Sequence, residues 1–212
     1  MSHLFIPVIC HLCNLSLQSG IFPSSHARAV VLPRLKKPTL RPNPDSLSSY
    51  RPISNLSFLS KVVERAVAKR YWRHVTTNSL LSSRQSAYRP FHSVETTLVS
   101  VHNDLVRATD NGLVTGLVLL DLSSAFDTVD HPILLSTLTH RHAVRDTALS
   151  WFQSYLTHRS QSSVAGDQTD DFILDCSVPQ GSVLGPLLFI SYTIEVSDVF
   201  WPTWWTVLPV RR

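Results

Sequence analysis

The chain has 212 residues, 43% of them hydrophobic and 16% charged, and this balance predicts a folded protein with a real core and excludes a disordered chain. The formal net charge of +4 favours an anionic partner such as nucleic acid, although many ordinary proteins share it. No run of about 18 apolar residues is present, so we expect no membrane span. No Lys or Arg precedes the apolar N-terminal stretch and no clear cleavage site follows, so we expect no secretory signal and an intracellular protein.

The first half of the chain predicts three helices and one strand. Apolar residues recur at helical spacing over 4–17, 57–72 and 94–108. The first of these ends at "QSGIFPSS", where Gly20 and Pro23 are stop signals. The β-branched run in "ARAVVLPRLKKP" predicts a short strand that ends in a basic cluster, and a Pro-rich loop follows it.

The second half begins with a predicted buried strand, Leu113–Leu120, which ends at Asp121. Two amphipathic helices are predicted in "HPILLSTLTHR" and "DTALSWFQSYLTHR". The next stretch, "SQSSVAGDQTDDFILDCSV", predicts a hairpin with its turn at 166–169. A Pro-Gln-Gly loop then leads into an apolar helix or a buried turn.

The cysteines do not predict a disulfide framework, since Cys10, Cys13 and Cys176 are odd in number and irregular in spacing. Cys10 and Cys13 have the two-residue gap of half a zinc site, but no second pair is spaced to complete it. Because they lie in an apolar stretch with helical spacing, we expect buried structural cysteines.

Asp121 is the residue that most directly suggests chemistry. A carboxylate at the end of a buried strand is costly unless it accepts hydrogen bonds or holds a cation. Magnesium prefers one or two carboxylates together with substrate phosphates, so Asp121 is a candidate metal ligand. Spacing alone supports equally a turn cap through Ser123 and Ser124. For Asp127, six residues on, a cap or ion pair is the favoured interpretation.

Four ordered blocks resemble the reverse transcriptases of non-LTR, LINE-type retrotransposons, and the jockey-like group most of all. The resemblance runs from about Leu15 to Tyr192. The blocks are "YRPISNLSFLSKVVERAV" (50–67), "RQSAYRPFHSVETTLV" (84–99), "LVLLDLSSAFDTVDH" (117–131) and "VPQGSVLGPLLF" (178–189).

The resemblance implies an α+β fold, the fingers and part of the palm of a right-hand polymerase, without a thumb. It places an N-terminal helical segment at 1–27, fingers at 28–112, a partial palm at 113–192 and an unrelated tail at 193–212. It also implies RNA-directed DNA polymerase chemistry with Mg²⁺, an RNA template, a DNA primer and dNTPs, in the nucleus or the cytoplasm.

The resemblance also assigns roles to single residues. Asp121 matches the first catalytic aspartate and would hold magnesium. Phe126 matches an aromatic residue that lies against the sugar of the incoming nucleotide and would favour dNTPs; a plain core phenylalanine is the alternative. The remaining nucleotide-binding candidates are Gln180 and Gly181 in the loop beside the new base pair, and Arg51, Lys36 and Lys37 near the triphosphate.

The second carboxylate motif of the family, Tyr/Phe-Ala-Asp-Asp, is not found where the resemblance places it. After Gln180 the acids are Glu195 and Asp198, which are not adjacent, while Asp170 and Asp171 precede the loop and are expected in a solvated turn. We therefore expect a truncated fragment without activity of its own. The alternatives are a catalytically dead nucleic-acid-binding module and a non-functional translated remnant.

The final stretch changes character, with three of the five tryptophans of the chain between 201 and 205. It is either an exposed aromatic binding surface or a tail from a frame shift or alternative splicing, and we favour the latter.

Overall fold

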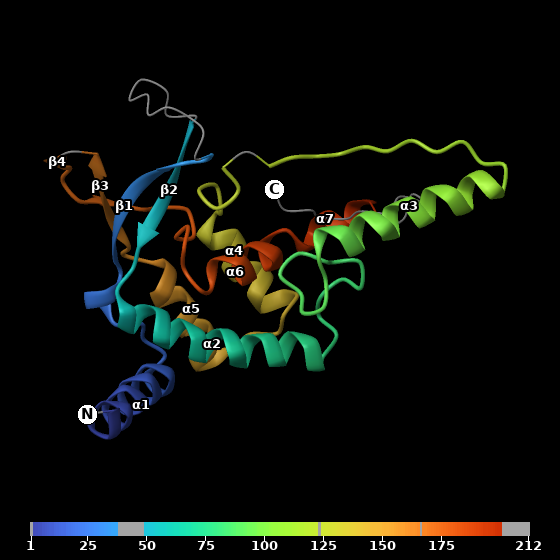
Figure 1. Ribbon diagram of the computed structural model, residues 1–212. Helices are drawn as coiled ribbons and strands as arrows, with labels where there is room; N and C mark the ends of the chain where they lie inside the picture. Colours follow the sequence, from blue (N-terminus) through green and yellow to red (C-terminus); the bar gives the residue numbers. More distant parts are fainter. Residues whose placement is uncertain (1, 38–48, 123, 166, 201–212) are drawn as a thin grey trace. The chain divides into compact units, whose positions relative to one another are not determined.

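The computed structural model describes residues 2–37, 49–122, 124–165 and 167–200 (Figure 1). The chain divides into two units, unit 1 with residues 1–80 and 125–192 and unit 2 with residues 81–124 and 193–212. Within the described ranges no helix is both long enough and apolar enough to cross a bilayer. The tryptophans at 201–205 lie outside these ranges.

Unit 1 contains a mixed β-sheet in the strand order β2-β1-β3-β4, with β5 also paired to β3. β1 runs antiparallel to β2 and parallel to β3, and β3 runs antiparallel to both β4 and β5. The parallel β1–β3 pair joins residues 28–31 to residues 160–163. The strands are β1 (Arg28–Leu35), β2 (Tyr50–Asn55), β3 (Ser160–Ala165), β4 (Asp167–Gln168) and β5 (Phe172–Ile173).

The helices of unit 1 surround an aromatic and aliphatic core. Buried side chains from three helices dominate it, namely Val63, Val67 and Tyr71, then Leu134 and Leu138, then Trp151, Phe152 and Tyr155. Phe22 packs edge-on against both Trp151 and Tyr155. The helices are α1 (Ser2–Ser19), the 3-10 turn η1 (Ser24–His26), α2 (Phe58–Thr77), α4 (His131–His140), α5 (Asp146–Leu156) and α6 (Gly185–Tyr192).

Local capping chemistry explains several helix ends. The Ser57 side chain accepts a hydrogen bond from the Ser60 amide at the start of α2, and Asp130 caps α4 at the Ile133 amide. α1 ends at Gly20, whose positive φ of 69° suits the close approach of its backbone to α5. These caps agree with the predicted positions of the helices.

Unit 2 contains α3 (Val94–Asp110) and α7 (Ile194–Phe200). A capping box of Ser93 and Thr96 starts α3, and the turn at Asn111 and Gly112 ends it. Arg84 pairs with Asp104 of α3 at 3.2 Å. The helix predicted over 94–108 is therefore confirmed.

The strand predicted over Leu113–Leu120 does not form. Residues 113–122 have no helix or strand and are exposed throughout, with Val114 at 101% and Leu119 at 81% exposure. A strand exists only through hydrogen bonds to a neighbour, and no strand of the described residues pairs with this segment. The apolar pattern is present, but the strands described in the structure offer it no pairing partner.

Other expectations are corrected or extended. Cys10 is exposed and Cys13 is half-buried, so the prediction that this pair is buried is wrong, and Cys176 is exposed as well. β2 was not expected, and Pro52 lies within it, yet it pairs with β1 along six residues. The hairpin at 160–178 is confirmed in β3 to β5, and the α+β class is confirmed by the helices and the mixed sheet.

Candidate active site

Two arginines face each other on the β1–β2 hairpin. Arg34 and Arg51 are register partners, and both side chains are exposed. Lys36 and Lys37 follow at the loop end of the hairpin and are exposed too, with the Lys36 amide donating to the Ser49 carbonyl. Within the described part of the chain none of these four side chains is in an ion pair.

This pairing has an electrostatic cost. Like charges directly opposite on neighbouring strands destabilise a hairpin, so the arrangement opposes folding slightly unless an anion binds there. The cationic end of the hairpin is thus suited to phosphate groups, for which the arginine fork offers bidentate hydrogen bonds. Sequence reasoning selected Arg51, Lys36 and Lys37 but missed Arg34, which only the strand register places beside Arg51.

The Pro-Gln-Gly loop lies against the edge of β2. The Ser54 amide donates a 2.8 Å hydrogen bond to the Gln180 carbonyl. Gly181 has φ of 111°, and a Cβ there would lie 3.1 Å from the Ser54 carbonyl oxygen and 3.6 Å from Ile53 Cγ2. Glycine is therefore required here by its backbone angle and by close packing against a strand.

The loop and the arginine pair share one face of the hairpin. Alternate residues of a strand point to the same side, so Ile53 lies on the side of Arg51, and its partner Leu32 lies on the side of Arg34. Gly181 packs against Ile53 on this face. Three features therefore lie one after another along one face of the hairpin. They are the apolar pair of Leu32 and Ile53, here called the apolar step, the glycine loop and the two arginines.

Phe126 packs against the far end of the same loop. Its ring lies 5.3 Å from the ring of Phe189, and a Cβ at Gly185 would lie 3.6 Å from its Cε1 atom. The Phe126 carbonyl accepts a 2.9 Å hydrogen bond from the Val178 amide. The side chain is half-buried, so one part of it contacts the core of unit 1 and another part stays accessible.

Glu64 holds this loop from beneath, and sequence reasoning missed it. It is fully buried, accepts from Ser60 Oγ at 2.7 Å, and accepts from the amides of Val183 and Leu184 at 2.7 and 3.2 Å. Burial, and then the charge of Glu64, raise the pKa of Tyr155. The signal was available, because Glu64 is the single acid of α2 and has the helical phase of its buried residues.

Asp121 belongs to unit 2, in the exposed segment without secondary structure. The other six predicted site residues belong to unit 1. In the described part of the chain no three His, Cys, Asp or Glu side chains form a group that could hold a metal ion. The role of Asp121 as a catalytic and metal-binding residue stays a prediction.

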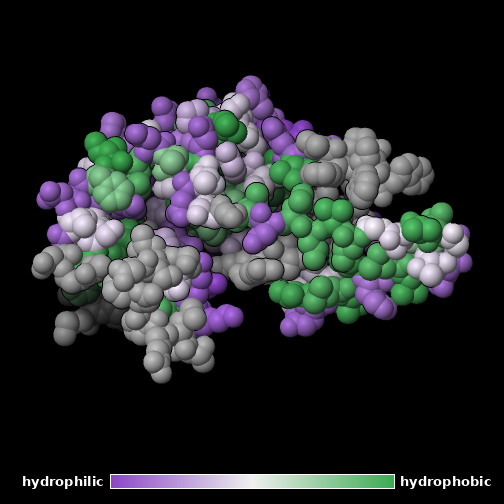
Figure 2. All heavy atoms as spheres, turned by 90° about the horizontal axis from the view of Figure 1, so that it is seen from above, coloured by the Kyte–Doolittle hydropathy of each residue, from purple (hydrophilic) through white to green (hydrophobic). Residues whose placement is uncertain are grey.

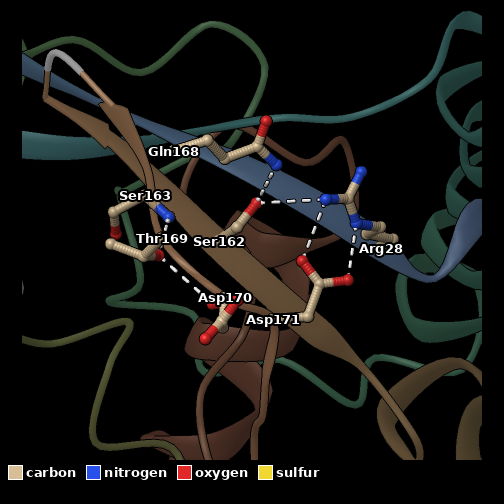
Figure 3. Close-up of polar contacts among 7 residues, drawn as sticks. All are labelled: Arg28, Ser162, Ser163, Gln168, Thr169, Asp170 and Asp171. Carbon is tan, nitrogen blue, oxygen red and sulfur yellow. Dashed lines mark hydrogen bonds and ion pairs between the residues drawn. The ribbon is translucent and has the colours of Figure 1, made fainter.

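Asp171 has a structural partner. Figure 3 shows its carboxylate facing the Arg28 guanidinium, with Nε–Oδ2 and Nη2–Oδ1 distances of 2.7 and 2.9 Å. This bidentate pair lowers the pKa of Asp171 below its usual value. Asp171 is exposed, as expected of a solvated position, and the β1–β3 pairing in addition brings Arg28 within reach of it.

Comparison with known proteins decides the family. The family model described as "Reverse transcriptase (RNA-dependent DNA polymerase)" matches residues 35–200. The chain belongs to this family. The LINE-type resemblance of its four sequence blocks is thereby confirmed, because reverse transcriptases of such elements are among its relatives.

Three relatives of this reverse transcriptase chain come from Drosophila mobile elements. It is 32% identical over 184 residues to a "Probable RNA-directed DNA polymerase from transposon BS" of Drosophila melanogaster, covering 86% of this chain and 20% of that protein. It is 29% identical to the "RNA-directed DNA polymerase from mobile element jockey" of Drosophila funebris, covering 87% and 20%. It is 31% identical to a "Probable RNA-directed DNA polymerase from transposon X-element" of Drosophila melanogaster, covering 70% and 16%.

This reverse transcriptase chain spans about a fifth of the length of the curated relatives that it matches. Its match with them covers most of its own residues, however, so the similarity extends well beyond one motif.

Proposed function

We propose that the chain is the substrate-binding part of an RNA-directed DNA polymerase from a mobile element, acting on an RNA template, a DNA primer and dNTPs. The observation that carries the proposal is the Arg34–Arg51 pair, on the face of the hairpin that Gly181 contacts. In this assignment residues 28–112 are fingers and residues 113–192 a partial palm. We place its work inside the cell, in the nucleus or the cytoplasm.

The basic end of the hairpin would bind the triphosphate of the incoming nucleotide. Arg51 and Arg34, assisted by Lys36 or Lys37, would offset the charge that develops on the phosphates. The apolar step of Leu32 and Ile53 and the Pro-Gln-Gly loop would lie beside the base pair, with Gln180 and Gly181 at its edge. Phe126 would lie against the sugar and favour dNTPs over nucleotides with a 2′-hydroxyl.

The described residues supply only part of a binding site for the magnesium that the family uses. Asp121 is a suitable hard oxygen ligand, but Mg²⁺ binding needs further charge, either from substrate phosphates or from a second carboxylate. The described residues alone do not complete such a site. We therefore derive no metal-dependent step and propose that the chain alone binds substrates without extending a primer.

Primer extension on an RNA template with dNTPs and magnesium tests this proposal. We expect template-primer binding without incorporation, and weaker dNTP binding in Arg51→Gln. Incorporation that disappears in Asp121→Ala would show a complete active site and contradict the expected inactivity. Binding of neither nucleotide nor template-primer would overturn the proposal, and the lack of a cooperative melt as well would favour a non-functional remnant.

A further inference from the structure

Four basic residues follow one another along α2 at intervals of four. They are Lys61, Arg65, Lys69 and Arg73, here called the α2 stripe. The last three are exposed and Lys61 is half-buried, and Arg70 adds a fifth exposed cation to the helix. Because residues four apart are neighbours on a helix, the stripe forms a continuous row about 18 Å long.

The stripe is not balanced by acids. The single acidic residue of α2 is Glu64, which is buried and accepts hydrogen bonds from the amides of Val183 and Leu184. In the described part of the chain no residue of the stripe is in an ion pair. Like charges four apart weaken a helix by about 0.2–0.5 kcal/mol per pair, so this row opposes helix formation.

The opposite face of α2 holds the stripe rigidly. Val63, Val67 and Tyr71 are buried in the core, and Tyr71 contacts Ser191 of α6 at 2.6 Å between their hydroxyl oxygens. The helix that bears the stripe is therefore fixed by the core, and through Glu64 it also holds the Pro-Gln-Gly loop in place. A helix fixed in this way loses little backbone freedom when its cations bind a row of anions.

Aromatic side chains accompany the cations. Phe58 and Trp72 lie seven residues before and after Arg65, which places all three on one side of the helix. Phe58 is 70% exposed, and Trp72 is half-buried. Exposed rings beside a basic row are typical of proteins that bind single-stranded nucleic acid, since bases stack on the rings while the cations follow the phosphates.

We propose that the α2 stripe binds the phosphodiester backbone of a single nucleic-acid strand, with Phe58 as a stacking surface for a base. The inference rests on the proposed function and deepens it by naming the surface that holds the strand. The row of about 18 Å is long enough to follow several consecutive phosphates of one strand. A membrane surface fits less well, because the apolar face of α2 is buried in the core.

Binding of a fluorescent single-stranded RNA 12-mer to the whole chain, measured over a range of salt concentrations, tests the stripe. The stripe variant is Arg65→Gln/Lys69→Gln/Arg73→Gln. The control variant, Arg107→Gln/Arg141→Gln/Arg145→Gln, removes the same net charge elsewhere. For the stripe variant we expect affinity about tenfold lower or more, and a salt slope reduced by about 2, at about 0.7 per phosphate contact. The control variant should change both the affinity and the salt slope less than the stripe variant does.

Phe58→Ala separates stacking from charge. It should weaken RNA binding about fivefold or more and leave the salt slope unchanged, because stacking releases no counterions. The stripe variant should melt at or above the temperature of the wild type, since it relieves like-charge repulsion. A single-stranded DNA arm of the same length shows whether the strand must be RNA.

Three results would overturn the inference. These are an unchanged affinity and slope in the stripe variant, an equal loss in the control variant, and stripe-dependent binding to anionic phosphatidylserine vesicles without RNA binding. Wild-type RNA binding that survives in the stripe variant rejects the stripe alone and leaves the proposed function standing. Absence of any nucleic-acid binding by the wild type rejects both.

Discussion

Glu64 connects a helix to the loop that carries two of the candidate nucleotide-binding residues. Its carboxylate accepts three hydrogen bonds while fully buried, and two of them come from loop amides that would otherwise have no partner. Removing one partner of such a group exposes the full cost of desolvating the other. The position of the loop therefore depends on a residue that lies within the 50–67 block but was not among the candidate site residues.

We expect Glu64→Ala to destabilise the fold by about 2–4 kcal/mol, and Glu64→Gln by less than about 1.5 kcal/mol, since an amide still accepts the loop hydrogen bonds. Denaturant unfolding measures both values. Amide exchange at Val183 and Leu184 should accelerate in the alanine variant and stay slow in the glutamine variant. Equal stability of the wild type and Glu64→Ala would refute this role.

His142 predicts a pH dependence of stability. It is fully buried, and in the described part of the chain neither ring nitrogen has a hydrogen-bond partner. Burial, with smaller contributions from His74 and Arg141, lowers the pKa of His142 from 6.5 to about 4. Because the unfolded chain takes up the proton first, stability is complete above pH 6.5 and falls as the pH drops towards 4.

The expected loss across this range is about 2–3 kcal/mol. Thermal unfolding at pH 7, 6, 5 and 4 measures it. His142→Phe should flatten the profile between pH 6.5 and 4, whereas His140→Gln, at an exposed position, should leave it unchanged. A profile that keeps its slope without His142 would show that another group is responsible.

At the scale of elements, strand pairing brings together residues that lie far apart in the sequence. The parallel β1–β3 pair sets Arg28 beside Ser160, and the Arg28 guanidinium then reaches Asp171 just before β5. Ser162 Oγ accepts from the same guanidinium at 3.4 Å and from Gln168 Nε2 at 2.9 Å, as Figure 3 shows. This polar cluster ties the ends of β1, β3 and β5 together.

The ion pair predicts that the sheet loosens in acid. Since Arg28 lowers the pKa of Asp171, the stabilisation is present at neutral pH and is lost as the pH falls through that lowered pKa, below about 4. The contribution is small because both side chains are substantially exposed. In the wild type, amide exchange of β3 and β5 should show this loss of stabilisation in acid. The Asp171→Asn variant should abolish the acid dependence. Asp170→Asn is the matched control, and an equal effect there would disprove the assignment.

At the scale of the whole molecule, a large apolar surface stays uncovered. Figure 2 shows apolar side chains gathered on its right-hand side, where Figure 1 places α3 and residues 113–122. Val114, Leu117, Val118, Leu119 and Leu120 of this segment are all at least 57% exposed. Exposed apolar patches of this kind promote association.

We expect the purified chain to self-associate as its concentration rises, and Val114→Lys/Leu119→Lys to remain monomeric to a higher concentration. Stability should change by less than about 0.5 kcal/mol, because both side chains are already exposed. Sedimentation velocity measures the association. Ser136→Lys/Gln153→Lys adds the same charge at exposed polar positions, and equal protection by that control would attribute the effect to charge alone.

The sequence by itself determined the local features of this protein and its family. Helices such as 57–72 and 94–108 were predictable because their spacing and caps lie within a few residues of one another. The four ordered blocks likewise identified a reverse transcriptase, and the Pro-Gln-Gly block predicted a loop that leads into an apolar helix. These signals are contained in consecutive residues.

The tertiary structure alone decided what depends on distant residues. It placed Arg34 opposite Arg51, buried Glu64 under the loop, gave Asp171 its partner and left residues 113–122 without a strand. Pairing partners and burial are set by chain segments up to about 140 residues apart, because hydrogen bonds and packing act between neighbours in space. Residue type and local spacing carry no direct record of those neighbours.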